Sequence, residues 1–165
     1  MVFVYHAFSI SAFEYLIPVF LIIAPYVTQN RLKFNFRGRD ILLGIIVSLI
    51  TLLPLIYFML QSNKEFSLLP AGVIFFQFFG ISLPEEIYFR GFLQESMGNN
   101  IKNVLLVSLL FSLMHVPQAV FYGDIYPLLT FFPSLIMGFL YMRTSNVLPS
   151  VIFHFLANIV WLGMR

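Results

Sequence analysis

Residues 68–93, LLPAGVIFFQFFGISLPEEIYFRGFL, form an apolar run that is long enough to cross a membrane as a helix. Near its end the run contains Glu85, Glu86 and Arg90, three ionisable side chains within six residues. A charge at membrane depth costs about 2.5–3.5 kcal/mol even on the insertion scales that give low values. We therefore expect these side chains to face a protein interior or a wet cavity and to mark a functional site.

The composition of the whole chain indicates a membrane protein. Its 165 residues are 60% hydrophobic and 10% charged, whereas soluble domains carry about 25% charged residues. The sequence predicts an all-α fold, a polytopic membrane helix bundle of about six transmembrane helices that forms one domain over residues 1–165. Besides the run above, the predicted spans are residues 3–27, 41–60, 104–122, 126–141 and 147–164.

Charge and cysteine content exclude several classes of function. The net charge of +2 is small and scattered, so no nucleic-acid partner is expected. The chain has no cysteine, which excludes a disulfide framework, a thiolate nucleophile and a cysteine-based metal site. The expected partners are the lipid bilayer and a membrane-associated protein or peptide substrate.

The distribution of basic residues predicts the topology. Residues 31–39 hold four cations and no acid, which is typical of a cytoplasmic loop. With six spans, both termini then lie on the non-cytoplasmic side of a multi-pass protein, in the plasma membrane if the source is prokaryotic. The first span has no preceding basic region and no small-residue cleavage site, so we expect it to be retained. His6 and Glu14 in this span have no motif around them, and we interpret both as structural.

Ionisable side chains on three predicted spans fall at similar depth. With a helical rise of 1.5 Å per residue, Glu85 lies roughly 15 Å, His115 roughly 20 Å and His154 roughly 12 Å from the nearest cytoplasmic connection. Three unrelated ionisable residues on separate spans would not be expected to lie at the same depth. The pattern predicts one shared site in the cytoplasmic half of the membrane or near its midplane.

The spacing of the two acids suggests different roles for them. Glu86 and Arg90 are four residues apart in the order that favours a helical ion pair. Glu85 is about 100° away on the helix and stays free for chemistry. Two structural alternatives stand beside this interpretation. Ser82 and Glu85 also match a capping box, which would make Glu85 the cap of a broken helix, and the pair of Glu86 with Arg90 can be purely structural.

Three short motifs on successive spans resemble those of a known family. The chain carries Glu85-Glu86-x-x-x-Arg90, then Phe111-x-x-x-His115, then His154-x-x-x-Asn158. In this order they resemble the type II CAAX prenyl endopeptidase family, also called the CPBP or Abi family of intramembrane proteases. The resemblance covers about residues 70–160, which we take as the catalytic core. It implies endopeptidase activity inside the membrane on a membrane-associated protein.

The resemblance also implies a role for each motif residue. Glu85 resembles the catalytic glutamate, and His115 resembles its partner at the attacking water. His154 and Asn158 resemble the pair that stabilises the oxyanion. The ion pair of the EExxxR motif resembles the supporting pair of the family.

The residue types fit peptide hydrolysis independently of this resemblance. Hydrolysis needs a base for water, a proton donor for the leaving amine and donors for the developing oxyanion. A carboxyl group, histidines and an asparagine supply all three. Metal-independent glutamate catalysis, with no required cofactor, is the favoured mechanism. Zinc is the alternative, because Glu85, His115 and His154 match a set of two histidines and one glutamate with an open fourth position.

Two other classes of function remain open from the sequence. Ionisable residues within the membrane also occur in proton-coupled transporters, although no inverted repeat is visible here. The same scaffold can serve as a non-catalytic binding or bacteriocin-immunity module. Cleavage of a membrane substrate, lost in Glu85→Gln, distinguishes a protease from both.

Overall fold

The computed structural model describes three stretches of the chain: residues 12–28, 33–62 and 64–164. For residues 12–16 it describes the backbone alone. The part of the first predicted span before residue 12, with His6, therefore lies outside the described residues, as does the side chain of Glu14.

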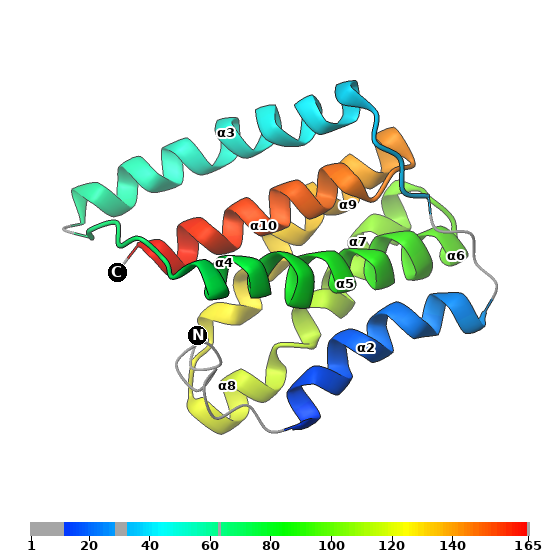
Figure 1. Cartoon of the computed structure of the whole chain (residues 1–165), viewed down its shortest axis with the longest axis horizontal. Coiled ribbons are helices and arrows are strands. Elements are labelled where there is room, and N and C mark those ends of the chain that lie inside the picture. The colour runs from blue at the N-terminus through cyan, green and yellow to red at the C-terminus, as the bar shows by residue number, and fades with distance from the viewer. Residues whose placement is uncertain (1–11, 29–32, 63, 165) are drawn as a thin grey trace.

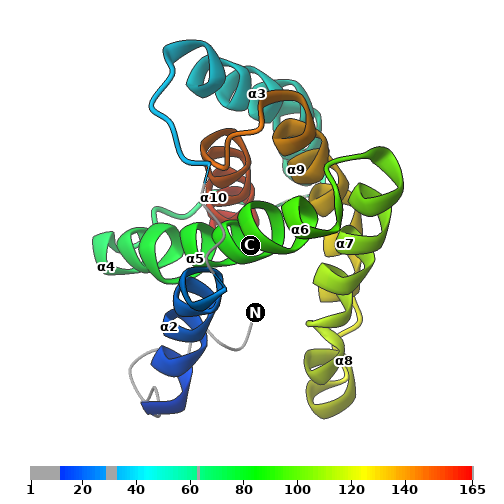
Figure 2. The same ribbon diagram turned by 90° about the vertical axis from the view of Figure 1, so that its right-hand side faces the viewer.

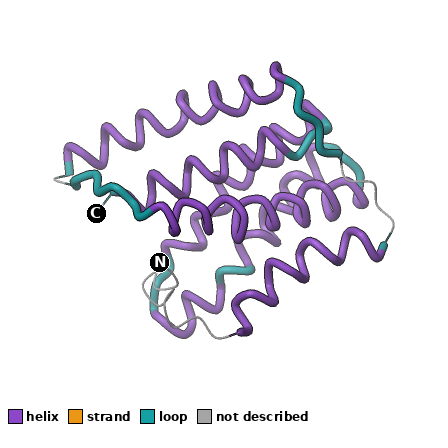
Figure 3. The backbone as a smooth tube through the Cα atoms, in the orientation of Figure 1, coloured by secondary structure: helices purple, strands orange, loops and turns teal. Residues whose placement is uncertain are grey.

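The described residues form helices and no strand, which confirms the all-α class (Figure 3). One isolated antiparallel bridge joins Phe66 to Met164. The first helices are α2 (Ala12–Val27) and α3 (Gly38–Gln61). One uninterrupted helical run then comprises α4 (Ala71–Phe76), η1 (Gln77–Ser82), α5 (Leu83–Glu86), η2 (Ile87–Gln94) and α6 (Glu95–Met97). The remaining helices are α7 (Ile101–Leu113), α8 (Val116–Tyr122), η3 (Tyr126–Thr130), α9 (Phe131–Thr144) and α10 (Leu148–Gly163).

Local sequence signals explain where several helices end. The helical run stops at Gly98, whose φ of 99° is a conformation that only glycine adopts easily. Helix α7 then begins behind Asn100, whose side chain accepts a hydrogen bond from the backbone N–H of Asn103 at 3.1 Å. The predicted span 104–122 corresponds to α7 and α8 together, with a break between the two helices. It breaks at His115 because Pro117, in the first turn of α8, has no N–H with which to continue the α7 ladder.

The run from α4 to α6 passes through Pro84 without breaking. Ser82 has helical dihedral angles, φ −62° and ψ −45°, and makes no side-chain capping hydrogen bond. The alternative in which Glu85 caps a broken helix is therefore wrong. Instead, segments of wider π-helix, η1 and η2, lie on either side of the single α-helical turn α5 that carries both acids. Such wide turns are frequent at functional sites.

The helices are stacked in layers (Figures 1 and 2). Helix α3 packs against α10, α10 packs against α9 and η1, and α9 packs against α7. Helix α2 covers the opposite side of the central run, where it contacts α5 and η2. The central run is thereby enclosed by α10, α7 and α2.

One end of the bundle is held together by polar contacts. Asn146, between α9 and α10, exchanges hydrogen bonds with the backbone of Asn35 at 3.0 and 2.7 Å. The same side chain donates to the buried carboxylate of Asp40 in the first turn of α3, at 3.0 Å. Lys33 also pairs with Glu95 in α6. The connections between α2 and α3, between α6 and α7 and between α9 and α10 therefore lie at one end of the bundle, on the right in Figure 1.

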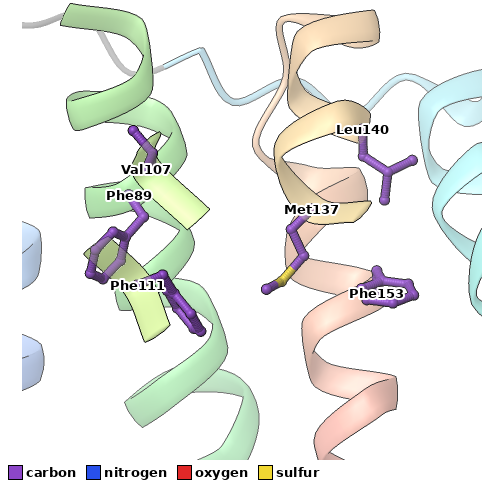
Figure 4. Packing of buried hydrophobic residues seen from close by; sticks show 6 residues of the cluster. All are labelled: Phe89, Val107, Phe111, Met137, Leu140 and Phe153. Carbon is purple, nitrogen blue, oxygen red and sulfur yellow. The ribbon is translucent and has the colours of Figure 1, made fainter. Parts of the chain in front are cut away.

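The buried apolar core lies between η2, α7, α9 and α10 (Figure 4). Its members are Phe89, Val107, Phe111, Met137, Leu140 and Phe153. Figure 4 shows Phe89 and Phe111 facing Met137 across the space between the helices. This core supports the EExxxR motif, because the guanidinium of Arg90 lies over the ring of Phe111.

Two helices in the described part of the chain are long and apolar enough to cross a membrane. They are Gly38–Gln61 and Ile101–Tyr122, the second being α7 and α8 together. Few of their residues are buried. On α3 the exposed residues include Leu49, Ile50 and Leu53, each at least half exposed. Apolar helices that expose such side chains are suited to a lipid environment rather than to the core of a soluble protein.

Candidate functional site

Polar side chains from two helical runs meet beside the apolar core. The turn α5 supplies Glu85 and Glu86, and η2 supplies Arg90 one helical turn later. Helix α10 faces them with His154. These four residues form the cluster that we call the acidic site.

The ion pair expected between Glu86 and Arg90 is present. Nε of Arg90 lies 3.2 Å from Oε2 of Glu86, and both side chains are fully buried. The guanidinium also donates from Nη2 to the hydroxyl and the carbonyl oxygen of Ser134 in α9, at 2.8 and 3.2 Å. Its Cζ atom lies 5.4 Å from the ring centroid of Phe111. A buried charge is tolerated when it is paired and hydrogen-bonded in this way.

His154 connects the two neighbouring acids. Its Nδ1 atom lies 3.0 Å from Oε1 of Glu86, and its Nε2 atom lies 3.8 Å from Oε2 of Glu85. Since the carboxylate of Glu86 is paired with Arg90 and accepts hydrogen bonds, Nδ1 carries the hydrogen. A carboxylate that holds one nitrogen of an imidazole fixes its tautomer and its orientation. Glu86 therefore aims Nε2 of His154 at Glu85.

The two acids differ sharply in environment. The side chain of Glu86 is fully buried, whereas that of Glu85 is 26% exposed. Glu86 has Arg90 and His154 as partners, while Glu85 has only the longer contact to Nε2 among the described residues. Neighbouring acids with such different surroundings can take separate roles. Glu85 is the one that an incoming molecule can reach.

His115 lies beside this cluster but makes no hydrogen bond to it within the described part of the chain. It sits at the break between α7 and α8, with φ −94° and ψ −2°. Its Nδ1 atom donates to the carbonyl oxygen of Phe111 at 3.1 Å, which leaves Nε2 as a hydrogen-bond acceptor in the neutral ring. The ring of Phe111 contacts both histidine rings, with centroids 5.4 Å from His115 and 5.7 Å from His154.

Asn158 follows His154 by one turn of α10 and faces the same side. Its Nδ2 atom donates to Oε1 of Gln77 in η1 at 3.1 Å. Gln77 is 3% exposed. Sequence reasoning missed Gln77 as well as Ser134, the partner of Arg90. The available signal was the same for both: each is a polar residue inside a predicted apolar span.

The comparisons with known proteins agree with the motifs. A family model described as "Type II CAAX prenyl endopeptidase Rce1-like" matches residues 67–160. The match covers more than half of the chain and includes all seven residues named in the three motifs.

The chain belongs to the type II CAAX prenyl endopeptidase Rce1-like family. The resemblance stated from the three motifs is thereby confirmed. Separate searches of curated proteins and of solved structures found no match. Membership implies a membrane-embedded protease of the CAAX-protease type that acts on a membrane-associated peptide.

For this Rce1-like chain, the described side chains do not form a ligand set for zinc. In the described part of the chain, no three His, Asp or Glu side chains come together as a metal ion requires. Of the proposed set Glu85, His115 and His154, Glu85 and His154 contact each other at 3.8 Å, whereas His115 makes no ion pair or hydrogen bond to either of them in the described part of the chain. Nδ1 of His154 is directed to Glu86.

Proposed function

We propose that this protein is an intramembrane endopeptidase that hydrolyses a peptide bond in a membrane-associated protein through water activated by Glu85. The proposal rests on one observation above all. A partly accessible carboxylate, Glu85, faces a histidine whose other nitrogen is held by a second, buried carboxylate. This arrangement supplies a free base beside a fixed hydrogen-bonding group.

In the proposed reaction, Glu85 takes a proton from water while the water oxygen forms a bond to the scissile carbonyl carbon. Nε2 of His115, left free by Phe111, accepts a hydrogen bond from the same water and aligns it. The carbonyl oxygen becomes an oxyanion. When the C–N bond breaks, the protonated Glu85 returns the proton to the leaving amine, so the enzyme is regenerated.

The oxyanion receives hydrogen bonds from His154 and Asn158, which lie one turn apart on α10. Because Nδ1–H of His154 is directed to Glu86, Nε2 can donate only when the ring is doubly protonated. We therefore assign the imidazolium form to His154 in the reaction and a charge-stabilising role to Glu86. The ion pair of Glu86 with Arg90 keeps this carboxylate in place.

The proposed setting is a six-helix, multi-pass bundle with both termini outside the cytoplasm and the site in the cytoplasmic half. It is supported by the polar end of the bundle, where the connections around Lys33, Gly98 and Asn146 come together. We further propose a single domain over residues 1–165 with its catalytic core at about residues 70–160. The catalysis is proposed to be of the glutamic type and to require no metal.

The deciding experiment is cleavage by the purified protein in detergent. The probe is an internally quenched peptide that ends in farnesyl-Cys-Val-Ile-Met, with its non-prenylated form as control. Wild type is expected to cleave the probe. Glu85→Gln is expected to cleave it at least about 10²–10⁴-fold more slowly while remaining folded. Preserved cleavage in Glu85→Gln would overturn the role of Glu85. Absence of cleavage of any membrane peptide by wild type would favour the immunity module or the transporter.

The same assay tests the metal question. Dialysis against a zinc chelator is expected to leave the rate unchanged. If the chelator abolishes cleavage and added Zn²⁺ restores it, the glutamic-type mechanism is wrong and the zinc alternative takes its place.

A further inference from the structure

Gln77 is a buried polar residue that the mechanism above does not use. It is the first residue of η1, eight positions before Glu85 on the same helical run, and it lies among apolar residues of the sequence AGVIFFQFFG. Only 3% of its surface is exposed. A polar side chain buried at membrane depth is costly, so its position calls for a functional or structural reason.

The partner of Gln77 is the side chain of Asn158. Oε1 of Gln77 accepts a hydrogen bond from Nδ2 of Asn158 at 3.1 Å. The neighbouring residues reinforce this contact, because the rings of Phe78 and Phe155 meet edge to face with centroids 5.3 Å apart. Segment η1 is thus fixed against α10 at the level of Asn158.

In this structure the hydrogen bond holds the amide of Asn158 with Nδ2 towards Gln77. A free asparagine amide can rotate by 180° and exchange its oxygen and nitrogen, which would present an acceptor instead of a donor to the oxyanion. Gln77 takes up one of the two N–H groups of Nδ2 and fixes the amide plane. The second N–H group is then free on a nitrogen whose position is held.

We propose that Gln77 is a positioning residue that holds Asn158 in the orientation in which it donates to the oxyanion. The inference rests on the proposed function, since it concerns the oxyanion role assigned to Asn158. Gln77 itself does not need to touch the substrate. Its effect on the rate is expected to pass entirely through Asn158.

The test compares Gln77→Met with Gln77→Glu in the farnesylated-peptide assay. Met has a similar length and no acceptor oxygen, whereas a protonated Glu keeps the shape and the acceptor. We expect Gln77→Met to lower kcat about ten-fold with KM within about two-fold, less than the loss of about 10²–10³ for removing an oxyanion donor. Gln77→Glu is expected to recover most of that loss. A merely structural role would lower the melting temperature and would not separate kcat from KM.

A double-mutant cycle with Asn158→Ala decides whether the two residues act together. In the Asn158→Ala background, Gln77→Met is expected to cause no further loss of kcat. If the double mutant loses kcat by the product of the two single-mutant factors, the inference is overturned. A wild-type kcat in Gln77→Met would overturn it as well. If Gln77→Met does not fold, Gln77→Asn replaces it, because this amide is too short to reach Asn158 and should show the same loss. Full activity of Gln77→Asn would equally overturn the inference.

The outcomes separate this inference from the proposed function. Failure of wild type to cleave, or an unchanged rate in Asn158→Ala, contradicts the proposed function. Cleavage by wild type, loss in Asn158→Ala and no loss in either Gln77→Met or Gln77→Asn contradict the role of Gln77 alone.

Discussion

Glu86 holds Nδ1 of His154 at 3.0 Å from its Oε1 atom, across 68 positions of the sequence. The same carboxylate pairs with Arg90 through its other oxygen. One buried acid thus fixes both a cation of its own helical run and an imidazole of α10. Because of this double contact, the loss of Glu86 and the loss of Glu85 are expected to have different effects on stability and activity, and these effects can be measured.

Replacement of Glu86 by glutamine is expected to damage folding as well as activity. Glu86→Gln leaves the charge of Arg90 buried without its partner, which costs about 3–5 kcal/mol in comparable cases. Glu85→Gln removes only a partly exposed carboxylate and is expected to stay near wild-type stability. Thermal melting in detergent and the rate per folded molecule distinguish the two variants. If Glu86→Gln is stable but inactive and Glu85→Gln is active, the roles assigned to the two acids must be reversed.

Truncation of Asn158 tests the oxyanion assignment. Asn158→Ala is expected to lower turnover by around 10²–10³ with little change in KM, because the lost hydrogen bond strengthens only as the oxyanion forms. Steady-state kinetics on the farnesylated probe give both constants. A rise in KM at unchanged kcat would assign Asn158 to substrate binding instead.

Close approach of α3 to α10 depends on Gly44. A Cβ atom at this position would lie 3.0 Å from both Cα and the carbonyl oxygen of Pro149, and these backbone atoms cannot move aside. Gly44→Val is therefore expected to destabilise the fold by about 1–3 kcal/mol. Gly72→Val is the matched control, since nothing lies within 4 Å of its Cβ position. Equal melting temperatures of the two variants would contradict the predicted contact.

The contact of Lys33 with Glu95 predicts a dependence of stability on pH. Burial alone would raise the pKa of Glu95, but hydrogen bonds from Lys33 and Tyr141 and the charge of Lys33 outweigh burial and lower this pKa. A lowered folded-state pKa gives stability that is present above the unfolded value near 4 and is lost as pH falls through the folded value. Glu95→Gln is expected to melt earlier than wild type at pH 7, and this difference in melting temperature is expected to shrink as the pH falls below 4. A constant difference across this range would contradict the assignment.

Single cysteines test the proposed topology, because the chain has none of its own. Arg37→Cys and Ser62→Cys both replace exposed residues, at opposite ends of α3. A membrane-impermeant thiol reagent added to intact cells is expected to label the second and not the first. The reverse labelling pattern would place the acidic site in the other half of the membrane.

The sequence was sufficient for features that depend on local chemistry. Apolar length predicted the helical segments closely, and the four-residue spacing of Glu86 and Arg90 predicted their ion pair. Gly98 ends a helix because glycine readily adopts its positive φ of 99°. The break at His115 is not visible in the apolar pattern, because that pattern continues through Pro117 while the missing N–H of this proline interrupts the helix.

The remaining contacts depend on how distant helices pack. Nothing in the neighbourhood of Glu86 indicates that its second partner is His154, and Ser134 is an ordinary small residue of an apolar helix. The hydrogen bond of Gln77 to Asn158 likewise joins segments 81 positions apart. Such pairs exist only after η1, α5 and α9 have been placed against one another and against α10.

The packing of α3 on α10 also has a consequence for biosynthesis. Asp40 and its partner Asn146 are 106 positions apart, so most of the helices lie between them in the chain. A ribosome completes α3 long before α10 leaves the exit tunnel, and during that interval the face of α3 with Asp40 and Ser48 has no final partner. Nascent chains paused before residue 146 should therefore hold α3 in a provisional position, at the insertion machinery or in lipid. The bundle is complete only when α3 packs against α10.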